Sequence, residues 1–418
     1  MSRYVVEGGV PLRGVVDAAA NKNAVLPIMA ATLLTDDECV LTNVPRIRDV
    51  TVMGNLMQRL GARVEGLGTN TLHISCADVR ETTLSADLVG RLRASVMLLA
   101  PVLARRGHVR TLEPGGCSIG RRDVSTHLEA LTALGATVGY LREGYEISAT
   151  QLTGTHIFLD EASVTATENT VMAACLARGV TVLKHAACEP HVEDFCTFLV
   201  KMGARIKGIG SNILTIEGVE HLQGAQHEII SDHLDVGTFA VAAAITGGEI
   251  TIRNAVPDHL EMIALCLRRM GVELEMGASS VSVRAGALRS TRKIATDPWP
   301  GFPTDLASIF IVLATQASGT TLIHDWMYEG RMFFIDKLVS MGANIILCDP
   351  HRCVVTGPTP LHGRMAHSPD LRAGAALVLA ALAAEGSSEI HDVEWVERGY
   401  ENFVDRLSAL GANIQKVD

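Results

Sequence analysis

Residues 192–216 read VEDFCTFLVKMGARIKGIGSNILTI, and this stretch decides the fold. Apolar residues recur at helical spacing up to Met202, which predicts an amphipathic helix. Gly203 follows, and a glycine ends a helix well because it adopts positive φ without strain. Arg205–Lys207 and Ile213–Ile216 then read as two short strands around a glycine-rich turn, which predicts a hairpin.

The phrase at Met202 recurs along the whole chain. The pattern is Leu or Met, then Gly, then Ala or Val, and it occurs at Leu60-Gly61-Ala62, Leu134-Gly135-Ala136, Met202-Gly203-Ala204, Met270-Gly271-Val272, Met341-Gly342-Ala343 and Leu410-Gly411-Ala412. Successive glycines are 74, 68, 68, 71 and 69 residues apart. Six copies at so even an interval indicate an internal repeat.

A second helix precedes the amphipathic one in each repeat and is apolar almost all round. These helices are predicted to begin near Asn23, Arg93, Thr167, Val236, Leu306 and Ala373. A helix without a polar face must be buried. Each repeat therefore supplies one buried helix, one half-exposed helix and several short strands.

The repeats predict an α/β fold with two closed domains, each of three repeats around three buried helices. The break between the domains is expected near Ile229–Asp232, where the chain has no Pro- or Gly-rich linker. The competing interpretation is a six-repeat solenoid. Solenoid repeats usually run about 20–45 residues, so the period of this chain favours closed domains.

Composition excludes several classes of protein. The net charge of -10 argues against a nucleic-acid partner, although local Arg and Lys clusters can still bind a phosphorylated small molecule. The longest run of small and apolar residues, Ala373–Ala384, is 12 residues, too short to span a membrane. The nine cysteines form no CxxC pair, and the N-terminus does not read as a signal peptide. We therefore expect a soluble cytoplasmic protein.

One cysteine differs from the rest. Residues 113–122 read EPGGCSIGRR, so Cys117 lies among three glycines with Arg121 and Arg122 after it. Such a loop allows close backbone approach to a ligand, and the arginines favour the thiolate and can hold a phosphate. The alternative is a surface loop with an incidental thiol. Six other cysteines read as small buried residues: Cys39, Cys175, Cys196, Cys266, Cys348 and Cys353.

Charged residues stand at the starts of several buried helices. Lys22 opens the first of them, where a cation opposes the helix dipole, so we expect it to face an anion. Similar phrases are Leu92-Arg93-Ala94-Ser95, Phe302-Pro303-Thr304-Asp305, Glu329-Gly330-Arg331, Asp370-Leu371-Arg372-Ala373 and Glu397-Arg398-Gly399-Tyr400. Asp305 alone could be a helix cap and each Arg a surface ion pair. Together they predict an anion-binding cleft where the domains face each other. The sequence contains no Walker A, HExxH or Gly-x-Ser-x-Gly motif.

These phrases, in this order, resemble those of the UDP-N-acetylglucosamine enolpyruvyl transferases of the EPSP synthase superfamily. The most specific ones are Asn21–Ala24, Pro114–Gly120, Phe302–Asp305, Glu329–Arg331, Asp370–Ala373 and Arg398–Glu401. The resemblance covers the whole chain. It implies two inside-out α/β barrels, residues 22–230 and residues 1–21 plus 231–418. It also implies transfer of the enolpyruvyl group of phosphoenolpyruvate to the 3-hydroxyl of UDP-N-acetylglucosamine, the first committed step of peptidoglycan synthesis.

The resemblance also implies roles for individual residues. Lys22, Arg122 and Arg398 are implied to bind phosphoenolpyruvate, with Arg331 and Arg372 nearby. Asp305 would take the proton of the sugar hydroxyl, and Cys117 would protonate the methylene carbon and form a covalent adduct. The implied sugar-nucleotide contacts are Asn23, Arg93, Asp123, Val124, Ser125, Thr126 and Met327. The family needs no metal or organic cofactor, and fosfomycin alkylates its loop cysteine.

Some positions depart from the family pattern, and they leave two other functions open. The departures are Arg48, Arg121, Asp123, Ser125, Thr165 and Gly330. One alternative is an enolpyruvyl transferase of secondary metabolism that acts on another uridine nucleotide. The other is a catalytically silent paralogue that senses a UDP-sugar, and the retention of Cys117, Asp305, Lys22 and Arg398 argues against it. Shikimate-phosphate enzymes share the fold but resemble neither the Cys117 loop nor Lys22-Asn23.

Overall fold

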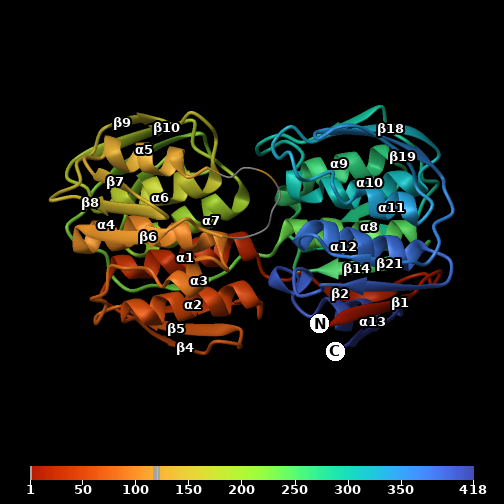
Figure 1. The fold of residues 1–418 in the computed structure, drawn as a ribbon, viewed down its shortest axis with the longest axis horizontal. Helices are drawn as coiled ribbons and strands as arrows, with labels where there is room; N and C mark the ends of the chain where they lie inside the picture. The colour runs from red at the N-terminus through yellow and green to blue at the C-terminus, as the bar shows by residue number, and fades with distance from the viewer. Residues whose placement is uncertain (1, 116–119, 121–122) are drawn as a thin grey trace. The chain divides into compact units, whose positions relative to one another are not determined.

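The computed structural model of this protein describes residues 2–115, 120 and 123–418 (Figure 1). Their contacts divide the chain into two compact units. The N-terminal unit contains residues 20–115 and 123–230. The C-terminal unit contains residues 2–19, 120 and 231–418.

The N-terminal unit holds the elements of the first three repeats. Its helices are α1 (Lys22–Ala31), η1 (Thr32–Leu34), α2 (Arg48–Leu60), α3 (Ala86–Val89), η2 (Arg93–Leu98), α4 (Leu99–Arg106), α5 (Ser125–Ala133), α6 (Val164–Cys175) and α7 (Pro190–Lys201). Its strands are β3 (Cys39–Thr42), β4 (Arg63–Glu65), β5 (Thr71–Ser75), β6 (His108–Leu112), β7 (Thr137–Leu141), β8 (Gly144–Ser148), β9 (His156–Phe158), β10 (Val180–Lys184), β11 (Arg205–Lys207), β12 (Ile213–Glu217) and β13 (Gln226–Glu228).

The C-terminal unit holds the last three repeats and the first two strands of the chain. Its helices are α8 (His233–Ile245), η3 (Pro257–Leu260), α9 (Glu261–Arg269), η4 (Thr304–Leu306), α10 (Ala307–Gln316), α11 (Ile335–Ser340), α12 (Leu371–Ala383), η5 (Val396–Arg398) and α13 (Phe403–Ala409). Its strands are β1 (Arg3–Glu7), β2 (Arg13–Asp17), β14 (Glu249–Arg253), β15 (Glu273–Met276), β16 (Ser280–Arg284), β17 (Lys293–Ala295), β18 (Gly319–His324), β19 (Asn344–Asp349), β20 (Arg352–Gly357), β21 (Met365–His367), β22 (Ser387–His391) and β23 (Asn413–Val417).

The apolar helices form the core of each unit, as the sequence predicts. Every residue of α8 is buried, and so are nearly all those of α10 and α12. These three helices pack against one another, as α6 does against α1 and α4 in the N-terminal unit. Figure 1 shows α8, α10 and α12 in the middle of their unit, with β18 and β19 on one side and β1 and β2 on the other. Burial of these largely apolar surfaces is the main source of stability.

The described strands form six sheets, three in each unit, so the number of sheets equals the number of repeats. Five of the sheets have four strands, for example in the order β11-β12-β10-β9. The sheet of the second repeat has three strands in the order β6-β8-β7. The predicted hairpin is confirmed, since β11 and β12 pair antiparallel around the turn at 208–212. The mixed α/β class that the sequence predicts is therefore present.

The start of the chain belongs to sheets at its end. β1 lies between β22 and β23 and pairs antiparallel with both, which places Arg3 opposite His391 and Val417. β2 runs parallel to β14. In Figure 1 the red N-terminal strands lie beside the blue C-terminal elements, with the two termini close together. The C-terminal unit is therefore assembled from both ends of the chain.

The six repeat glycines end their helices in the way that the sequence predicts. All six have positive φ, between 85° and 105°: Gly61, Gly135, Gly203, Gly271, Gly342 and Gly411. At each one the backbone N–H donates to the carbonyl three residues before it. Since this backbone conformation strains any residue with a Cβ atom, the repeat depends on glycine here.

Two of these glycines give a test of strain against packing. We expect Gly203→Ala to lower the free energy of unfolding by about 1 kcal/mol through positive φ alone, because nothing lies within 4 Å of the position that a Cβ atom would take there. Gly61→Ala should cost a further ~1–2 kcal/mol, because its Cβ atom would lie 2.6 Å from the carbonyl oxygen of Asp78. Both lie in the N-terminal unit, so urea unfolding compares them directly. Equal losses would contradict the packing argument.

One prediction for the cysteines is wrong. Cys39, Cys175, Cys196, Cys266 and Cys353 are buried as expected, whereas Cys348 is exposed. Cys348 lies on β19, the last strand of the sheet β17-β18-β20-β19, where the neighbouring Ile346 and Leu347 are exposed too. An apolar run on an edge strand reads like a core strand in sequence, and only the strand order distinguishes them.

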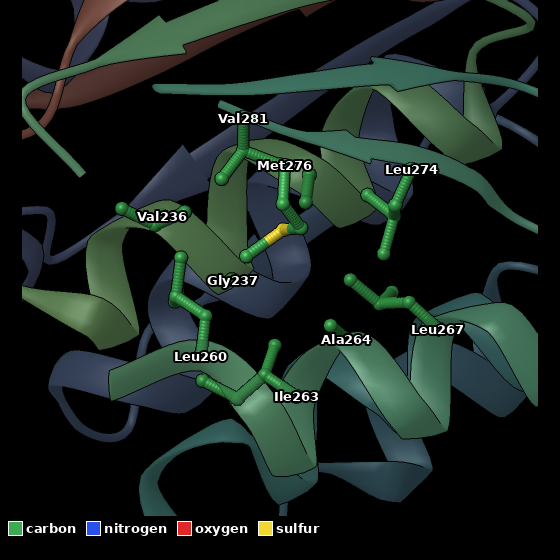
Figure 2. A pocket seen from close by; sticks show the side chains of 10 residues that line it. Val236, Gly237, Leu260, Ile263, Ala264, Leu267, Leu274, Met276 and Val281 are labelled. Carbon is green, nitrogen blue, oxygen red and sulfur yellow. The ribbon is translucent and has the colours of Figure 1, made fainter. Parts of the chain in front are cut away.

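An apolar pocket lies where α8 and α9 pack beside β15 and β16 (Figure 2). Its lining residues are Val236, Gly237, Ala240, Leu260, Ile263, Ala264, Leu267, Leu274, Met276 and Val281. These side chains offer no charged or hydroxyl group to orient a ligand, so the pocket reads as imperfect packing of the core. Among the described residues, no helix is long and apolar enough to cross a membrane.

Candidate active site

Lys22 opens α1 in the N-terminal unit. The side chain of Asn21 caps this helix by accepting hydrogen bonds from the backbone N–H groups of Asn23 and Ala24. The position of Lys22 in the sequence predicts that it faces an anion, and the structure supplies one within the protein. Its Nζ lies 2.6 Å from the Oδ2 atom of Asp49, a buried carboxylate in the first turn of α2. This ion pair offsets the unfavourable position of a cation at a helix N-terminus.

Arg93 holds both ends of the segment that contains the predicted reactive cysteine. Its Nη1 atom donates to the carbonyl of Pro114 at 3.3 Å, and Nη2 donates to the carbonyl of Asp123 at 3.2 Å. The planar guanidinium group suits this bridging because its N–H groups diverge at fixed angles. Arg93 therefore fixes the two chain ends between which residues 115–122 run.

Cys117 and Arg122 lie outside the described residues. Their predicted roles as acid, covalent partner and phosphate ligand stay predictions.

Asp123 and the residues after it begin α5. The Oδ1 atom of Asp123 accepts a hydrogen bond from the backbone N–H of Ser125 at 2.9 Å, and this bond is the main reason that the pKa of Asp123 is lowered. Val124 is buried, and the hydroxyl of Thr126 donates to Asp160 at 2.9 Å. The predicted nucleotide-contacting residues 123–126 thus form one tight turn with defined local bonds.

Three predicted residues come together in the C-terminal unit. Arg331 pairs with the Oδ1 atom of Asp305, and Arg372 contacts Oδ2 through Nε at 3.1 Å and Nη2 at 3.0 Å. Both arginines are buried, whereas the side chain of Asp305 keeps 24% of its surface exposed. The carboxylate is therefore held from behind by two cations and can still be reached by a ligand.

This arrangement sets the protonation state of Asp305. Burial alone would raise the pKa of the carboxyl group, but Arg372 and Arg331 outweigh burial and hold the pKa well below its ordinary value. Asp305 is thus ionised throughout the physiological range. It can accept a hydrogen bond, but it is a weak base as long as both arginines remain paired to it.

Two aspartates position these groups. Asp370 caps α12 by accepting from the backbone N–H groups of Arg372 and Ala373, so the guanidinium group of Arg372 leaves from the first turn of a buried helix. Buried Asp325 accepts from the hydroxyl of Thr304, next to Asp305, at 2.6 Å and from the backbone N–H of Met327 at 3.1 Å. The loops that carry Asp305 and Met327 are therefore tied to a single carboxylate.

Arg398 lies at the end of η5. The carbon Cζ of its guanidinium group lies 5.2 Å from the centre of the Trp395 ring, a cation–π contact. This contact leaves the side chain half-buried rather than exposed on a surface.

The structure corrects two alternatives and adds residues. Asp305 does not cap a helix, because η4 has no side-chain cap and its carboxylate binds arginines instead. Arg331 and Arg372 are buried rather than surface groups. Sequence reasoning missed Asp49 and Asp325, which no local pattern marks. Within the described part of the chain, no group of three or more His, Cys, Asp or Glu side chains is placed to hold a metal ion.

Asp232, beside Arg372, gives a pH-dependent test. It is buried and caps α8. Burial raises its pKa from 3.8 to about 6. Arg372 lowers this pKa, and Asp235 raises it by less than burial does. A raised folded pKa means that the folded state binds more protons, so stability falls as pH rises from about 4 through 6. Asp232→Asn keeps the cap without the charge.

We therefore compare the free energy of unfolding of Asp232→Asn with that of the unchanged protein at pH 8 and at pH 4.5. The difference, variant minus unchanged protein, should be more favourable to the variant at pH 8 by on the order of 2 kcal/mol. Urea unfolding of the two proteins at both pH values measures this. Asp258→Asn, at an exposed position in the same unit, is the control and should show no such difference. A pH-independent effect of Asp232→Asn would contradict the assignment.

Comparison with known proteins shows the family of this chain. A family model for EPSP synthase (3-phosphoshikimate 1-carboxyvinyltransferase) matches residues 6–407. The chain belongs to the EPSP synthase family. Within that family it is 46% identical over 425 residues to the UDP-N-acetylglucosamine 1-carboxyvinyltransferase of Borreliella burgdorferi, covering 100% of this chain and 99% of the relative. The proteins of the same name from Treponema denticola and Bacteroides fragilis are 44% and 46% identical and are covered over 99% and 100% of their lengths.

Solved structures agree with this family assignment. The enolpyruvyl transferase NikO from Streptomyces tendae superimposes with a TM-score of 0.90 at 25% identity, over 100% of this chain and 99% of that one. The EPSP synthase from Acinetobacter baumannii superimposes with a TM-score of 0.77 at 18% identity, which shows the shared fold alone. The resemblance found in the motifs is therefore confirmed over the full length of this EPSP synthase-family protein.

Proposed function

We propose that this protein transfers the enolpyruvyl group of phosphoenolpyruvate to the 3-hydroxyl of UDP-N-acetylglucosamine and releases phosphate. The observation that carries the proposal is full-length identity of 44–46% to relatives named UDP-N-acetylglucosamine 1-carboxyvinyltransferase. The exposed edge of Asp305 between two buried arginines supports it, since such a site suits anionic substrates that bring a hydroxyl group.

The reaction is an addition followed by an elimination. Asp305 accepts the proton of the sugar 3-hydroxyl as its oxygen bonds to C2 of phosphoenolpyruvate, and Cys117 delivers a proton to C3. This gives a tetrahedral intermediate. Loss of a proton from C3 and cleavage of the bond between C2 and the phosphate oxygen then yield the enol ether and inorganic phosphate. The sulfur of Cys117 also forms a covalent adduct with phosphoenolpyruvate.

Because Asp305 is paired with two arginines, binding of phosphoenolpyruvate also changes the pKa of Asp305. Its carboxylate and phosphate compete with Asp305 for the N–H groups of Arg331 and Arg372, and Arg331 Nε and Arg372 Nη1 have no hydrogen-bond partner among the described residues. As an anion binds there, each arginine shares its charge with the substrate. The pKa of Asp305 then rises toward its ordinary value, so the base gains strength only when the electrophile is present.

The remaining roles follow the family pattern. Lys22, Arg122 and Arg398 bind phosphoenolpyruvate, and Asn23, Arg93, Met327 and residues 123–126 contact the sugar nucleotide. The reaction requires no metal and no organic cofactor, because proton transfer and cationic side chains supply the chemistry. The protein acts in the cytoplasm in peptidoglycan synthesis. The two domains are residues 22–230 and residues 1–21 with 231–418, and the sheets of each close around its helices as an inside-out barrel.

One assay tests the function. The protein is mixed with phosphoenolpyruvate and UDP-N-acetylglucosamine, and phosphate release and the mass of the sugar nucleotide are followed. We expect stoichiometric phosphate and a nucleotide heavier by one enolpyruvyl group. Parallel reactions contain uridine diphosphate glucose, another uridine nucleotide or shikimate 3-phosphate. Release with one of these and none with UDP-N-acetylglucosamine would overturn the substrate assignment, and no release with any acceptor would indicate a silent binding protein.

A further inference from the structure

A buried tyrosine lies behind the arginines of the site. Tyr400 is 1% exposed, and its hydroxyl lies 2.9 Å from the Oγ1 atom of Thr238 on α8. The guanidinium carbon of Arg372 lies over the Tyr400 ring, 5.2 Å from its centre. The same arginine binds Asp305 on its other side. Tyr400 is therefore one layer behind the carboxylate, within the C-terminal unit.

The hydrogen bonds fix which hydroxyl is the donor. The Oγ1 atom of Thr238 lies 2.8 Å from the carbonyl oxygen of Leu234, one turn earlier in α8, and a carbonyl can only accept. Thr238 has one hydroxyl hydrogen, and Leu234 takes it. Thr238 must therefore accept from Tyr400, whose O–H donates to it. The chain of donors runs from Tyr400 through Thr238 to Leu234.

This direction decides how the phenol acts on Arg372. Because the hydroxyl hydrogen points to Thr238, the lone pairs of the Tyr400 oxygen stay available to the guanidinium group. The ring face and the oxygen both favour a cation, and Tyr400 contributes to raising the pKa of Arg372, after burial, which lowers it, and Asp305, which raises it. The arginine is thereby held between a carboxylate and an aromatic face.

We propose that Tyr400, oriented by Thr238, is a positioning residue that sets how tightly Arg372 binds Asp305. Without the Tyr400 hydroxyl, the ring loses its hydrogen bond to Thr238, so the aromatic face against Arg372 is no longer fixed and the guanidinium group is held less tightly against Asp305. The geometry of Asp305 toward the sugar hydroxyl then changes, although the substituted residue touches no substrate. The inference rests on the proposed transferase function, in which Asp305 receives the proton.

The first test is Tyr400→Phe, which keeps the ring and removes the oxygen. We expect kcat to fall about 10- to 100-fold, as a small misplacement of a catalytic group does, with the KM for UDP-N-acetylglucosamine changed less than threefold. Loosening of Arg372 also raises the pKa of Asp305, so more of the base is protonated at low pH in the variant. The kcat/KM of the variant, divided by that of the unchanged protein, should therefore decrease from pH 8 to pH 5. A kcat within twofold and an unchanged pH profile would overturn the proposal.

The second test separates positioning from general destabilisation. Thr238→Val removes the acceptor and keeps the shape, whereas Thr238→Ser keeps the hydroxyl. We expect Thr238→Val to lower kcat as Tyr400→Phe does, Thr238→Ser to retain it within threefold, and the double variant to be no worse than either single one. Additive losses in the double variant, or equal losses for Val and Ser at position 238, would overturn the pairing.

Two controls complete the design. Tyr140→Phe removes the hydroxyl of an exposed tyrosine, at 77% exposure, and should leave kcat and the pH profile unchanged. The unchanged protein is assayed for phosphate release in the same series. If it releases phosphate and the Tyr400 variant behaves like it, the positioning role fails and the function stands. If the unchanged protein releases none with any acceptor, the proposed function itself fails.

Discussion

Asp305→Asn is expected to lower kcat about a thousandfold while the protein still binds UDP-N-acetylglucosamine. Asparagine has nearly the shape of aspartate but cannot accept the proton of the sugar hydroxyl, and loss of a positioned base typically costs about 10²–10⁴ in rate. Product formation under saturating substrates measures the loss, and titration calorimetry with the sugar nucleotide measures binding. A kcat within tenfold of the unchanged protein would show that another group takes the proton.

The same substitution should also destabilise the protein. It leaves Arg331 and Arg372 buried without their shared counter-ion, and breaking a buried ion pair from one side costs roughly 3–5 kcal/mol. Urea unfolding therefore accompanies the assay, which is run well below the unfolding midpoint. The control is Asp258→Asn, which removes one exposed carboxylate from the same unit and should change neither property.

Cys117→Ser is expected to abolish most turnover and all covalent labelling while the sugar nucleotide still binds. A serine hydroxyl has nearly the same size as a thiol but is a far weaker acid, so it neither protonates the methylene carbon nor forms the adduct at neutral pH. The expected loss in kcat is about 10²–10⁴. Fosfomycin provides a second readout, because one adduct per chain should appear by intact-mass analysis and vanish in the variant.

Cys348 supplies the matched control. Its thiol is exposed on β19, so an accessible but uninvolved cysteine is compared directly with Cys117. Cys348→Ser should keep full turnover and take up one fosfomycin adduct. Full turnover in Cys117→Ser, or labelling that is lost in Cys348→Ser instead, would contradict the role assigned to the loop cysteine.

Several charged residues of the candidate site could be predicted from short sequence motifs. Lys22 facing an anion and charged residues at the starts of buried helices both follow from helix chemistry over a few residues. What these phrases could not give is the partner of each charge. Asp49 lies 27 positions beyond Lys22, and nothing in its local sequence marks it as the partner of that lysine.

The sequence alone determined the repeat, the helix ends and the buried helices. Glycine at positive φ and an apolar surface all round a helix are properties of short segments, so Gly203 and α8 could be placed without a structure. Only the tertiary structure decided which distant segments meet. β1 pairs with residues 380 to 414 positions further along the chain, and Asp305 joins Arg331 of its own repeat and Arg372 of the next. The physical reason is that these contacts depend on packing between repeats, where similar local sequences acquire different neighbours.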